Sequence, residues 1–481
     1  MKYEDDSLAL HMDLYELNMG YTYWKKGNAD KQSVFEVYYR SNPFGMGYTI
    51  FSGLERVIDY IENLAFSDSD IAYLREELGY EEAFLDFLQD WKFRGTIRAM
   101  REGEVAFANE PLIQVEGPIF DSQIIETALL NIVNYQTLIA TKGAKVKTAA
   151  EGDTVMEFGA RRAQELDAAI WGARAAYIGG ADSTSNTRAA KLFDIPVSGT
   201  HAHSLIQAYR NEYKAFRAYA ETHEDCVFLV DTYDSIHSGV PNAIKVADEM
   251  GDQINFIGVR LDSGDLSYQS KRVRELLDDA GYPDTKIFAS NDLDAETITS
   301  LKMQGAKIDV WGVGTKLITA FDQPALGAVY KIVSVENGGG GMSPTLKLTS
   351  NVEKITTPAK KQVWRIRSEN DTKPEGDLIC LSDERPDLKE ELFMFHPQHT
   401  YINKTVTDFI ARPLLIDIFV DGEKVYEEPT LEEIRAYAKE KLAEQYEEHR
   451  RLLNPEKYPV DLSQKLYDLK VDTINYFRED H

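Results

Sequence analysis

The fold is decided by the stretch INFIGVRLDSGDLSYQSKRVRELLDDAGYPDTKIFASNDLDAETITSLKMQGAKIDVWGVGTKL, residues 254–317. It repeats one unit: a short run rich in β-branched and aromatic residues, a polar or glycine-containing cluster, and a helical pattern. The expected strands are Ile254–Val259, Lys286–Ala289 and Ile308–Trp311, and the expected helices are Tyr268–Ala280 and Glu296–Gly305. Strands that alternate with helices in this way predict right-handed crossovers and a parallel sheet.

The same unit extends back along the chain to about residue 150. The further strands that we expect are Thr154–Phe158, Tyr177–Gly179, Ile195–Ser198 and Cys226–Val230, and the further helices are Arg161–Ala176 and Ser204–Thr222. Some seven units between residues 150 and 330 favour an irregular α/β barrel that need not be closed.

The flanking segments have a different pattern. Residues 1–135 mix expected helices and strands: Leu54–Leu64, Ala83–Trp91, Val34–Tyr39, Thr96–Met100 and Pro111–Val115. After residue 335 come a glycine run that predicts a flexible loop, two strands and a charged helix: Gly338–Gly341, Thr345–Leu348, Gln362–Ile366 and Leu431–Leu453. We therefore expect an N-terminal α/β sandwich domain (1–135), a barrel (136–335) and a C-terminal segment (336–481) that packs on both. The adjoining sandwich domain is thus expected to be built from N-terminal and C-terminal segments.

The composition narrows the class of protein. The chain has 481 residues, 43% hydrophobic and 28% charged, with a formal net charge of −27, which argues against a nucleic-acid surface. It has no run of the ~18 apolar residues that a membrane helix needs, and its acidic N-terminus predicts no targeting peptide. Cys226 and Cys380 match no metal or redox spacing. We expect a cytoplasmic protein in which any anionic substrate meets a locally basic site.

Nearly every expected strand ends in residues that can do chemistry. The clusters are Glu157 to Arg162, Asp182 to Asn186, Thr200 to His203, Asp231 to Asp234, Arg260 to Asp265, Ser290 to Asp292 and Gly312 to Lys316. Active sites of βα barrels lie at the carboxyl ends of the strands. The sequence therefore predicts that one pocket collects all seven clusters.

Two of these clusters favour an anionic ligand. In GVGTK, residues 312–316, the two glycines let backbone N–H groups approach an anion, and Thr315 and Lys316 add a hydroxyl and a charge. Taken alone, this motif is more typical of a tight strand-to-helix turn, but its position at the predicted site face favours an anion site. In VRLDSGD, residues 259–265, Arg260 can bind a phosphate by two hydrogen bonds, and Asp262 can hold ribose hydroxyls or Mg²⁺. Asp265 fits that role or a solvated Asx turn.

Two more clusters add carboxylates and a ring surface. VDTYDS, residues 230–235, places Asp231 and Asp234 after a strand, and carboxylates beside anion-binding groups indicate a metal-bound polyphosphate. EFGARRA, residues 157–163, offers Phe158 for stacking and Arg161 for a bound anion. Arg162 is better explained by ordinary salt bridges.

SGTHAHS, residues 198–204, sets two histidines two residues apart after a Gly-Thr turn. A lone histidine is more often a structural residue than a nucleophile. Here the turn leaves backbone donors at an expected helix N-terminus, where a developing phosphoryl charge can be held. A neutral histidine oriented by a partner is a competent phosphoryl acceptor.

Together the motifs resemble those of nicotinate phosphoribosyltransferases. The matching stretches run in order along nearly the whole chain: DLYELNMGYTYW (13–24), VFEVYYRSNPFGMGYTIFSGLE (34–55), NEPLIQVEGP (109–118), EFGARRAQELD, GGADSTSN, SGTHAHS, VRLDSGDL, FASNDLDAETI, WGVGTKL and NPEKYPVDLS (454–463). The resemblance implies a type II phosphoribosyltransferase, an irregular α/β barrel with an α/β sandwich domain, in a homodimer whose active sites are shared. It also implies a reaction of nicotinate with phosphoribosyl diphosphate, with Mg²⁺, that is coupled to ATP hydrolysis through a phosphohistidine in NAD salvage.

The resemblance also implies roles for individual residues. The phosphorylated histidine falls on His203, although His201 replaces a residue that is usually apolar, so either histidine can be the acceptor. The residues expected at nicotinate are Thr200, Phe158, Arg161 at the pyridine carboxylate, and Tyr15 from the other subunit. Those expected at phosphoribosyl diphosphate are Arg260, Thr315, Gly312 and Gly314, and Asp182 and Ser290 are further substrate contacts. Asp234 and Asp262 are expected to bind ribose or Mg²⁺.

Three alternatives stay open. A nicotinamide phosphoribosyltransferase would differ in ring preference, because nicotinamide lacks the carboxylate that Arg161 is expected to pair with. A barrel aldolase or metal-dependent hydrolase would need a catalytic lysine at a strand end or a group of histidine ligands. A non-catalytic nucleotide-binding regulator would keep the scaffold without the reaction.

Overall fold

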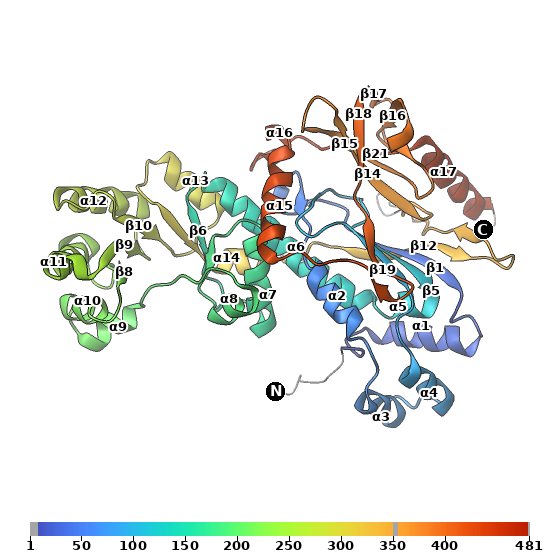
Figure 1. Ribbon diagram of the computed structural model, residues 1–481, viewed down its shortest axis with the longest axis horizontal. Coiled ribbons are helices and arrows are strands. Elements are labelled where there is room, and N and C mark those ends of the chain that lie inside the picture. The colour runs from blue at the N-terminus through green and yellow to red at the C-terminus, as the bar shows by residue number, and fades with distance from the viewer. Residues whose placement is uncertain (1–7, 350–354, 480–481) are drawn as a thin grey trace. The chain divides into compact units, whose positions relative to one another are not determined.

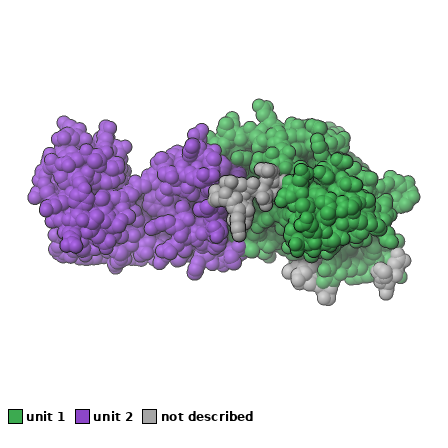
Figure 2. All heavy atoms as spheres, turned by 90° about the horizontal axis from the view of Figure 1, so that it is seen from below, with its two compact units in different colours: residues 1–138, 325–481 green, residues 139–324 purple. Residues whose placement is uncertain are grey.

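The structure, a computed structural model, describes residues 8–349 and 355–479. The chain forms two compact units, coloured separately in Figure 2. Unit 2 is the continuous stretch Ile139–Pro324, and unit 1 combines Met1–Leu138 with Ala325–His481. The N-terminal and C-terminal segments therefore belong to one unit, and the helix α6 (Glu126–Ala149) contains the boundary at residue 138.

Unit 2 is built on a curled parallel sheet of six strands (Figure 1). These are β6 (Thr154–Glu157), β7 (Ser183–Thr184), β8 (Asp225–Leu229), β9 (Asn255–Leu261), β10 (Lys286–Ala289) and β11 (Val310–Val313). Their order is β7-β6-β11-β10-β9-β8, and each neighbouring pair is parallel. In the described sheet β7 and β8 are the two edges, so the predicted irregular α/β barrel is confirmed as an open half-barrel.

Eight helices of unit 2 follow or connect these strands. They are α7 (Glu165–Ile178), α8 (Thr187–Phe193), α9 (His203–Tyr209), α10 (Glu212–Ala220), α11 (Val240–Met250), α12 (Leu266–Asp279), α13 (Ala295–Met303) and α14 (Thr315–Ile318). Polar residues at the strand ends also begin helices: Asp265 Oδ1 accepts a hydrogen bond from the Tyr268 backbone N–H at 2.9 Å, and Asp294 Oδ1 one from Thr297 at 2.7 Å. The same short loops thus end strands and start helices.

Three local predictions in unit 2 were wrong. Tyr177–Gly179 is not a strand, because Tyr177 and Ile178 form the buried last turn of α7. The expected strand Ile195–Ser198 is reduced to a single bridge between Val197 and Thr184. The expected helix Ser204–Thr222 is broken between α9 and α10, where Arg210 adopts a left-handed conformation with φ 53°. Short apolar runs look alike in strands and buried helix turns, which explains the first error.

Unit 1 contains a seven-stranded sheet that mixes strands from both ends of the chain. Its order is β13-β12-β1-β5-β3-β19-β20. The strands are β1 (Gln32–Tyr38), β3 (Thr96–Ala99), β5 (Ile113–Pro118), β12 (Val329–Glu336), β13 (Met342–Pro344), β19 (Ile416–Val420) and β20 (Glu423–Lys424). Because β1 pairs with β12 and β3 with β19, the expected domain made from N-terminal and C-terminal segments is confirmed.

A second sheet of six strands lies in the C-terminal part of unit 1, in the order β17-β16-β21-β15-β14-β18. The strands are β14 (Lys361–Ser368), β15 (Pro374–Leu381), β16 (Glu391–Phe395), β17 (Asn403–Thr407), β18 (Phe409–Pro413) and β21 (Val460–Leu462); β2 (Thr49–Ile50) and β4 (Val105–Ala106) form a separate pair. The helices of unit 1 besides α6 are α1 (Leu14–Lys25), α2 (Leu54–Glu62), α3 (Asp68–Glu76), α4 (Glu82–Asp90), α5 (Ile119–Gln123), α15 (Leu431–Glu444), α16 (Glu447–Arg450) and α17 (Gln464–Glu479). None of the helices in the described parts of the chain is long and apolar enough to cross a membrane.

The glycine run expected as a flexible loop is the turn of a hairpin. Gly338–Gly341 joins β12 to β13, and Asn337 Oδ1 accepts hydrogen bonds from the backbone N–H groups of Gly339 at 3.0 Å and Gly341 at 3.2 Å. The Asn337 amide also donates to Ser343 Oγ. An asparagine side chain that bonds its own turn in this way fixes the turn locally.

Candidate active site

Arg260 is the centre of a polar cluster at the carboxyl edge of the unit 2 sheet. Its Nη1 donates to Thr200 Oγ1 at 2.7 Å, its Nε to Ser290 Oγ at 2.9 Å and its Nη2 to Asp262 Oδ1 at 3.2 Å. The guanidinium carbon lies 5.6 Å from the centre of the Phe158 ring. The Arg260 side chain therefore meets predicted site residues from the ends of β6, β9 and β10 and from the loop before α9, and 15% of it stays exposed.

Asp262 stays ionised within this cluster. Burial would raise its pKa, but the hydrogen bond from the Ser290 hydroxyl and the charge of Arg260 outweigh burial and lower it. Ser290 Oγ thus bonds both partners, as an acceptor from Arg260 and a donor to Asp262. A fixed arginine beside an ionised carboxylate can bind a phosphate together with its cation.

His203 faces two carboxylates across the loops that follow β8 and β9. Its Nε2 lies 3.6 Å from Asp262 Oδ2 and 3.9 Å from Asp231 Oδ1, and its Nδ1 lies 3.1 Å from Thr232 Oγ1. The Asp231 side chain is 2% exposed. Its Oδ2 accepts hydrogen bonds from the Asp262 backbone N–H and the Ser263 hydroxyl, whereas Oδ1 has no hydrogen-bond partner in the described part of the chain.

The sequence places Asp231 and Asp234 in one motif, but the ribose or Mg²⁺ role was predicted for Asp234 alone. The available signal was its position: Asp231 follows the apolar end of a strand directly, as Asp262 does. Asp234 lies in the next turn, where Oδ1 accepts hydrogen bonds from the backbone N–H groups of Ile236 and His237. In the described residues its hydrogen bonds all stay within this turn, so the structure does not bring Asp234 to Asp262.

His201 is a core residue. It is 8% exposed, and its Nε2 accepts a hydrogen bond from the Leu229 backbone N–H at 3.2 Å. Its ring packs near those of Phe216 and Tyr219, with centroids 5.8 Å and 5.0 Å away. Burial lowers its pKa to about 4, so at neutral pH it is an uncharged acceptor. Of the two histidines, His203 is the one that faces the polar cluster.

Phe158 lies against the strand β11 because two glycines leave room for it. A Cβ at Gly312 would lie 2.7 Å from the Phe158 ring, and a Cβ at Gly314 would lie 3.0 Å from the Phe158 carbonyl oxygen. The Phe158 N–H donates to the Val313 carbonyl at 2.8 Å. The GVGTK glycines thus bring the ring of Phe158 next to Arg260, a packing role that the sequence did not predict.

The turn after Phe158 is held by a buried carboxylate. Glu157 accepts hydrogen bonds from the Gly159 N–H and from Thr184 Oγ1, and burial raises its pKa. Arg161 follows in this turn as an exposed residue with no hydrogen-bond or ion-pair partner in the described residues. Thr315 is the first residue of α14, and the charge of its neighbour Lys316 is paired with Asp294 at 2.6 Å.

The structure does not bring two further predicted residues to this cluster. Asp182 precedes β7, and its Oδ2 accepts hydrogen bonds from Lys147 at 2.7 Å and from the Val155 N–H at 2.9 Å, near the amino end of β6. Tyr15 belongs to unit 1, on α1, and is 45% exposed. Burial raises the pKa of Tyr15, and the nearby carboxylate of Glu126, to which it is hydrogen-bonded, raises it further.

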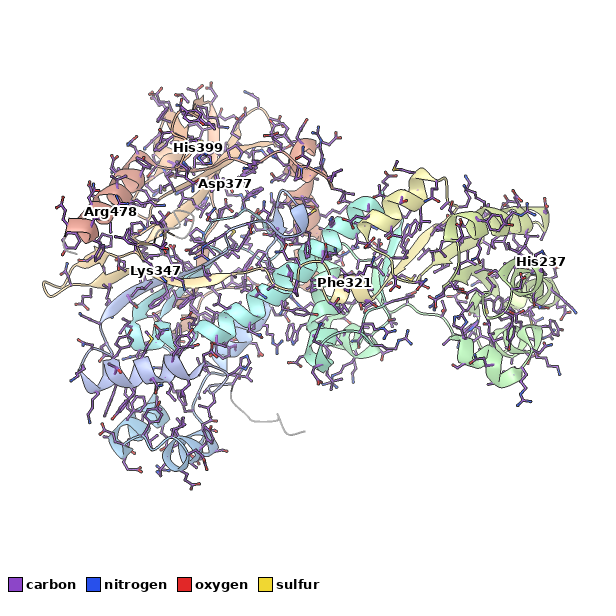
Figure 3. All side chains as sticks on the ribbon, turned by 180° about the vertical axis from the view of Figure 1, so that it is seen from behind. His237, Phe321, Lys347, Asp377, His399 and Arg478 are labelled. Carbon is purple, nitrogen blue, oxygen red and sulfur yellow. The ribbon has the colours of Figure 1, made fainter. Side chains whose placement is uncertain are left out.

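Unit 1 also contains a group of neighbouring cations that sequence reasoning missed. Burial lowers the pKa of Lys331, Glu126 raises it, and the charges of Arg40 and Lys347 lower it again. The Arg40 Nε atom is buried without a hydrogen-bond partner in the described chain. Lys347, labelled in Figure 3, is exposed. Arg40 and Lys347 are thus close enough to Lys331 to lower its pKa, and a group of cations of this kind favours a bound anion.

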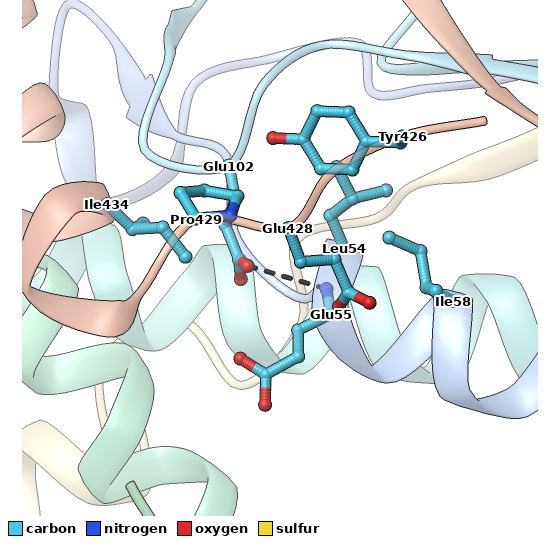
Figure 4. A pocket seen from close by; sticks show the side chains of 8 residues that line it. All are labelled: Leu54, Glu55, Ile58, Glu102, Tyr426, Glu428, Pro429 and Ile434. Carbon is cyan, nitrogen blue, oxygen red and sulfur yellow. Dashed lines mark hydrogen bonds between the residues drawn. The ribbon is translucent and has the colours of Figure 1, made fainter. Parts of the chain in front are cut away.

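A pocket of about 210 Å³ in unit 1 is a separate feature (Figure 4). Glu102 lines it and caps α2, accepting hydrogen bonds from the Gly53 and Glu55 N–H groups. Its other lining residues are Leu54, Glu55, Ile58, Tyr426, Glu428, Pro429 and Ile434. No residue predicted for the active site lines this pocket.

The fold and the cluster define an α/β-barrel enzyme whose site binds an anionic substrate at the carboxyl ends of its strands. Three family models match the chain: the nicotinate phosphoribosyltransferase (NAPRTase) N-terminal domain over residues 10–134, the NAPRTase family over 154–343 and the C-terminal domain over 360–470. The chain belongs to the nicotinate phosphoribosyltransferase family.

Known proteins agree with this assignment. A nicotinate phosphoribosyltransferase of Bacillus subtilis is 56% identical over 473 residues, which cover 98% of this chain and 96% of that protein. One from Dictyostelium discoideum is 36% identical, covering 95% of this chain and 86% of the relative. The crystal structure of human nicotinic acid phosphoribosyltransferase matches with a TM-score of 0.84 at 29% identity, over 96% of this chain and 99% of that one.

Proposed function

We propose that the protein joins nicotinate to phosphoribosyl diphosphate, giving nicotinate mononucleotide and diphosphate in NAD salvage, with ATP hydrolysis coupled through a phosphohistidine at His203. The observation that carries this proposal is the Arg260 cluster, which holds Thr200, Ser290 and Asp262 within hydrogen-bond reach of one guanidinium at the strand ends. Membership of the family and the names of its relatives support the choice of substrates.

The reaction needs a stabilised leaving group. The lone pair of the pyridine nitrogen attacks C1 of the ribose, the C1–O bond breaks, and diphosphate leaves with the electron pair. That nitrogen carries no proton, so the step needs no general base. Arg260 can stabilise the departing charge, because a ligand phosphate can replace the neutral hydroxyls of Thr200 and Ser290 as its hydrogen-bond acceptors.

Mg²⁺ fits the carboxylates of this cluster. Asp231 Oδ1 is buried and unpartnered in the described chain, and Asp262 is kept ionised beside it. Hard cations prefer such oxygens, and Mg²⁺ in phosphate sites usually binds one or two carboxylates plus the substrate. The described residues hold no group of three or more His, Cys, Asp or Glu arranged for a metal. Asp231 and Asp262 would hold the ion in the complex with phosphoribosyl diphosphate, where it would neutralise diphosphate charge, while Asp234 caps its own turn.

The site is proposed to be shared between two copies of the chain. Tyr15 of unit 1 is exposed, and we expect it to stack on nicotinate in a second copy, opposite Phe158. Arg40, Lys331 and Lys347 also belong to unit 1 and could meet the diphosphate there. The chain has a net charge of −27, and many of its cations are paired with its own carboxylates. In a homodimer, the second subunit would thus bring additional cations to the anionic substrate.

We assign the preference for nicotinate over nicotinamide to Arg161. This side chain is exposed and has no hydrogen-bond or ion-pair partner among the described residues. The test is a product assay with purified protein, Mg²⁺ and phosphoribosyl diphosphate, with nicotinate or nicotinamide, each with and without ATP. We expect mononucleotide from nicotinate, stimulated by ATP. Arg161→Ala should raise KM for nicotinate, and Arg162→Ala, a neighbouring exposed arginine, is the matched control. A preference for nicotinamide would overturn the role of Arg161, and lack of product from both rings would overturn the proposed function.

A further inference from the structure

The two nitrogens of the His203 ring have different surroundings. Nε2 faces the carboxylates of Asp262 and Asp231 at 3.6 Å and 3.9 Å. Nδ1 faces a neutral hydroxyl, Thr232 Oγ1, at 3.1 Å. Thr232 is the residue after Asp231, so a single short loop reaches both sides of the ring.

These surroundings select one tautomer of the neutral ring. A proton on Nε2 is attracted by both carboxylates, whereas a lone pair on Nε2 would be repelled by them. Nδ1 then carries the lone pair and accepts the hydrogen bond from the Thr232 hydroxyl. If the ring turned over, carbon atoms would replace both nitrogens and all these interactions would be lost.

We propose that Thr232 is a positioning residue for His203: its hydroxyl holds the ring in the orientation that keeps the Nε2 proton on the carboxylates and leaves Nδ1 as the acceptor of the phosphoryl group. The proposal rests on the phosphohistidine in the proposed function. It adds a residue that neither the motifs nor the family match singled out.

The phosphoryl transfer can be written for this arrangement. The Nδ1 lone pair forms the N–P bond with the γ-phosphorus of ATP, the bond from that phosphorus to the bridging oxygen breaks, and ADP leaves with the electron pair. The ring becomes positively charged while Nε2 keeps its proton, and the carboxylates of Asp231 and Asp262 stabilise that charge. The Thr232 hydroxyl gives up Nδ1 in this step and can donate to a phosphoryl oxygen instead.

The test compares three variants of the full-length protein. Thr232→Val keeps the shape of the side chain without the hydroxyl, and Thr232→Ser restores the hydroxyl. Thr222→Val is a matched control, because Thr222 Oγ1 makes the same kind of bond, at 2.9 Å, to Nδ1 of the exposed His223. The measurements are the amount and the isomer of phosphohistidine formed from ATP, by phosphorus NMR under alkaline conditions, and the ATP hydrolysed per mononucleotide formed.

We expect the wild type and Thr222→Val to form one isomer, on Nδ1. Thr232→Val should form roughly tenfold less phosphohistidine, as expected for a lost hydrogen bond of about 1.4 kcal/mol, with both isomers present and more ATP hydrolysed per product. KM for nicotinate should change less than about twofold, and Thr232→Ser should recover most of the yield.

The opposite results would overturn the proposal. Wild-type yield and a single isomer in a folded Thr232→Val, checked by its thermal unfolding, would show that the hydroxyl does not position the ring. If Thr232→Val does not fold, Thr232→Ala is measured instead and judged in the same way. A wild type that forms phosphohistidine on Nε2 would refute the orientation alone, whereas a wild type that makes product without any phosphohistidine would refute the coupling step as well.

Discussion

Two arginines in this molecule each stand at the centre of a polar cluster, yet only one of them can exchange its hydrogen-bond partners for a ligand. Arg365 of unit 1 is 4% exposed and donates to Glu104 at 2.7 Å, to both oxygens of Asp377 at 2.9 Å and 2.7 Å, and to the Val105 carbonyl. Arg260 of unit 2 is 15% exposed, and two of its three partners are hydroxyls. Arg365 is held mainly by buried carboxylates. Arg260 is held mainly by neutral hydroxyls, which a phosphate can displace.

The carboxylates of the two clusters also differ in their hydrogen bonds. Asp377, labelled in Figure 3, also accepts a hydrogen bond from the Tyr458 hydroxyl at 2.8 Å, and Glu104 accepts one from Arg412 at 2.9 Å. Burial would raise the pKa of Glu104, but the charges of Arg365 and Arg412 lower it. In the Arg260 cluster, by contrast, the buried Oδ1 atom of Asp231 has no hydrogen-bond partner in the described chain. The Arg365 cluster is thus held together by paired charges, whereas the Arg260 cluster keeps hydroxyl partners that a ligand can replace.

The largest effect should come from opening the Arg365 cluster. Arg365→Met would leave Glu104 and Asp377, at 1% and 0% exposure, without their main counter-charge. We expect the free energy of unfolding to fall by about 3–5 kcal/mol, as for other broken buried ion pairs. Chemical denaturation of wild type and variant measures this. A loss below about 1 kcal/mol would show that the network relaxes, and the contrast between the two clusters would fail.

The second effect is on catalysis. Arg260→Lys keeps the charge but cannot reach Thr200, Ser290 and Asp262 together, so we expect kcat/KM for phosphoribosyl diphosphate to fall about 10²–10³-fold. The free energy of unfolding should change by less than about 1 kcal/mol, because the site is partly exposed. Arg272→Lys, an exposed arginine on α12 paired with Glu275, is the matched control. If Arg260→Lys lost much of its free energy of unfolding but kept normal activity, Arg260 would have a structural role, as Arg365 does.

A third prediction concerns the pH dependence that the burial of His201 causes. His201 has a pKa lowered to about 4 in the folded protein against 6.5 when unfolded, so the unfolded state binds more protons between these values. Stability therefore falls as the pH drops, by about 2 kcal/mol from pH 7.5 to pH 5 and about 3 kcal/mol in all. In His201→Gln, whose amide oxygen can still accept from Leu229, this part of the pH dependence should vanish.

Urea titrations of the wild type and of His201→Gln at pH 7.5 and pH 5 measure this part of the pH dependence. If the free energy of unfolding changed equally between pH 7.5 and pH 5 in the wild type and in His201→Gln, the assignment of His201 to the core would be wrong.

The fold was predictable where the pattern was repetitive. The strand–cluster–helix unit located β9, β10 and β11 within two residues at each end, because alternation of apolar and polar stretches is set by burial along the chain itself. The helix α6 was missed, since a helix that is buried nearly all round shows no amphipathic stripe. The sheet of unit 1 pairs β3 with β19, more than 300 residues apart, which no local pattern encodes.

The site was predictable as a set of loops but not as a set of contacts. The sequence predicts one pocket for Arg260, Asp262, Ser290 and Thr200, and the structure adds that one guanidinium joins them. The sequence motifs did not separate Asp231 from Asp234, although Asp231 directly follows the apolar end of its strand and Asp234 lies in the next turn. The sequence also did not indicate that Gly312, which has no side chain, leaves room for the Phe158 ring.

The smallest effect tests that distinction. Hydrogen bonds from the backbone N–H and then the side chain of His237 lower the pKa of Asp234, and asparagine can cap the same turn, so Asp234→Asn should change kcat less than about threefold. Asp231→Asn should lower the Mg²⁺-dependent rate at least about tenfold, because it removes a charge from the oxygen that faces His203. Mg²⁺ titrations of both variants at fixed substrate measure this. Equal losses would mean that the metal uses both aspartates and that the turn around Asp234 rearranges when substrate binds, whereas a larger loss for Asp234 would restore the assignment made from sequence.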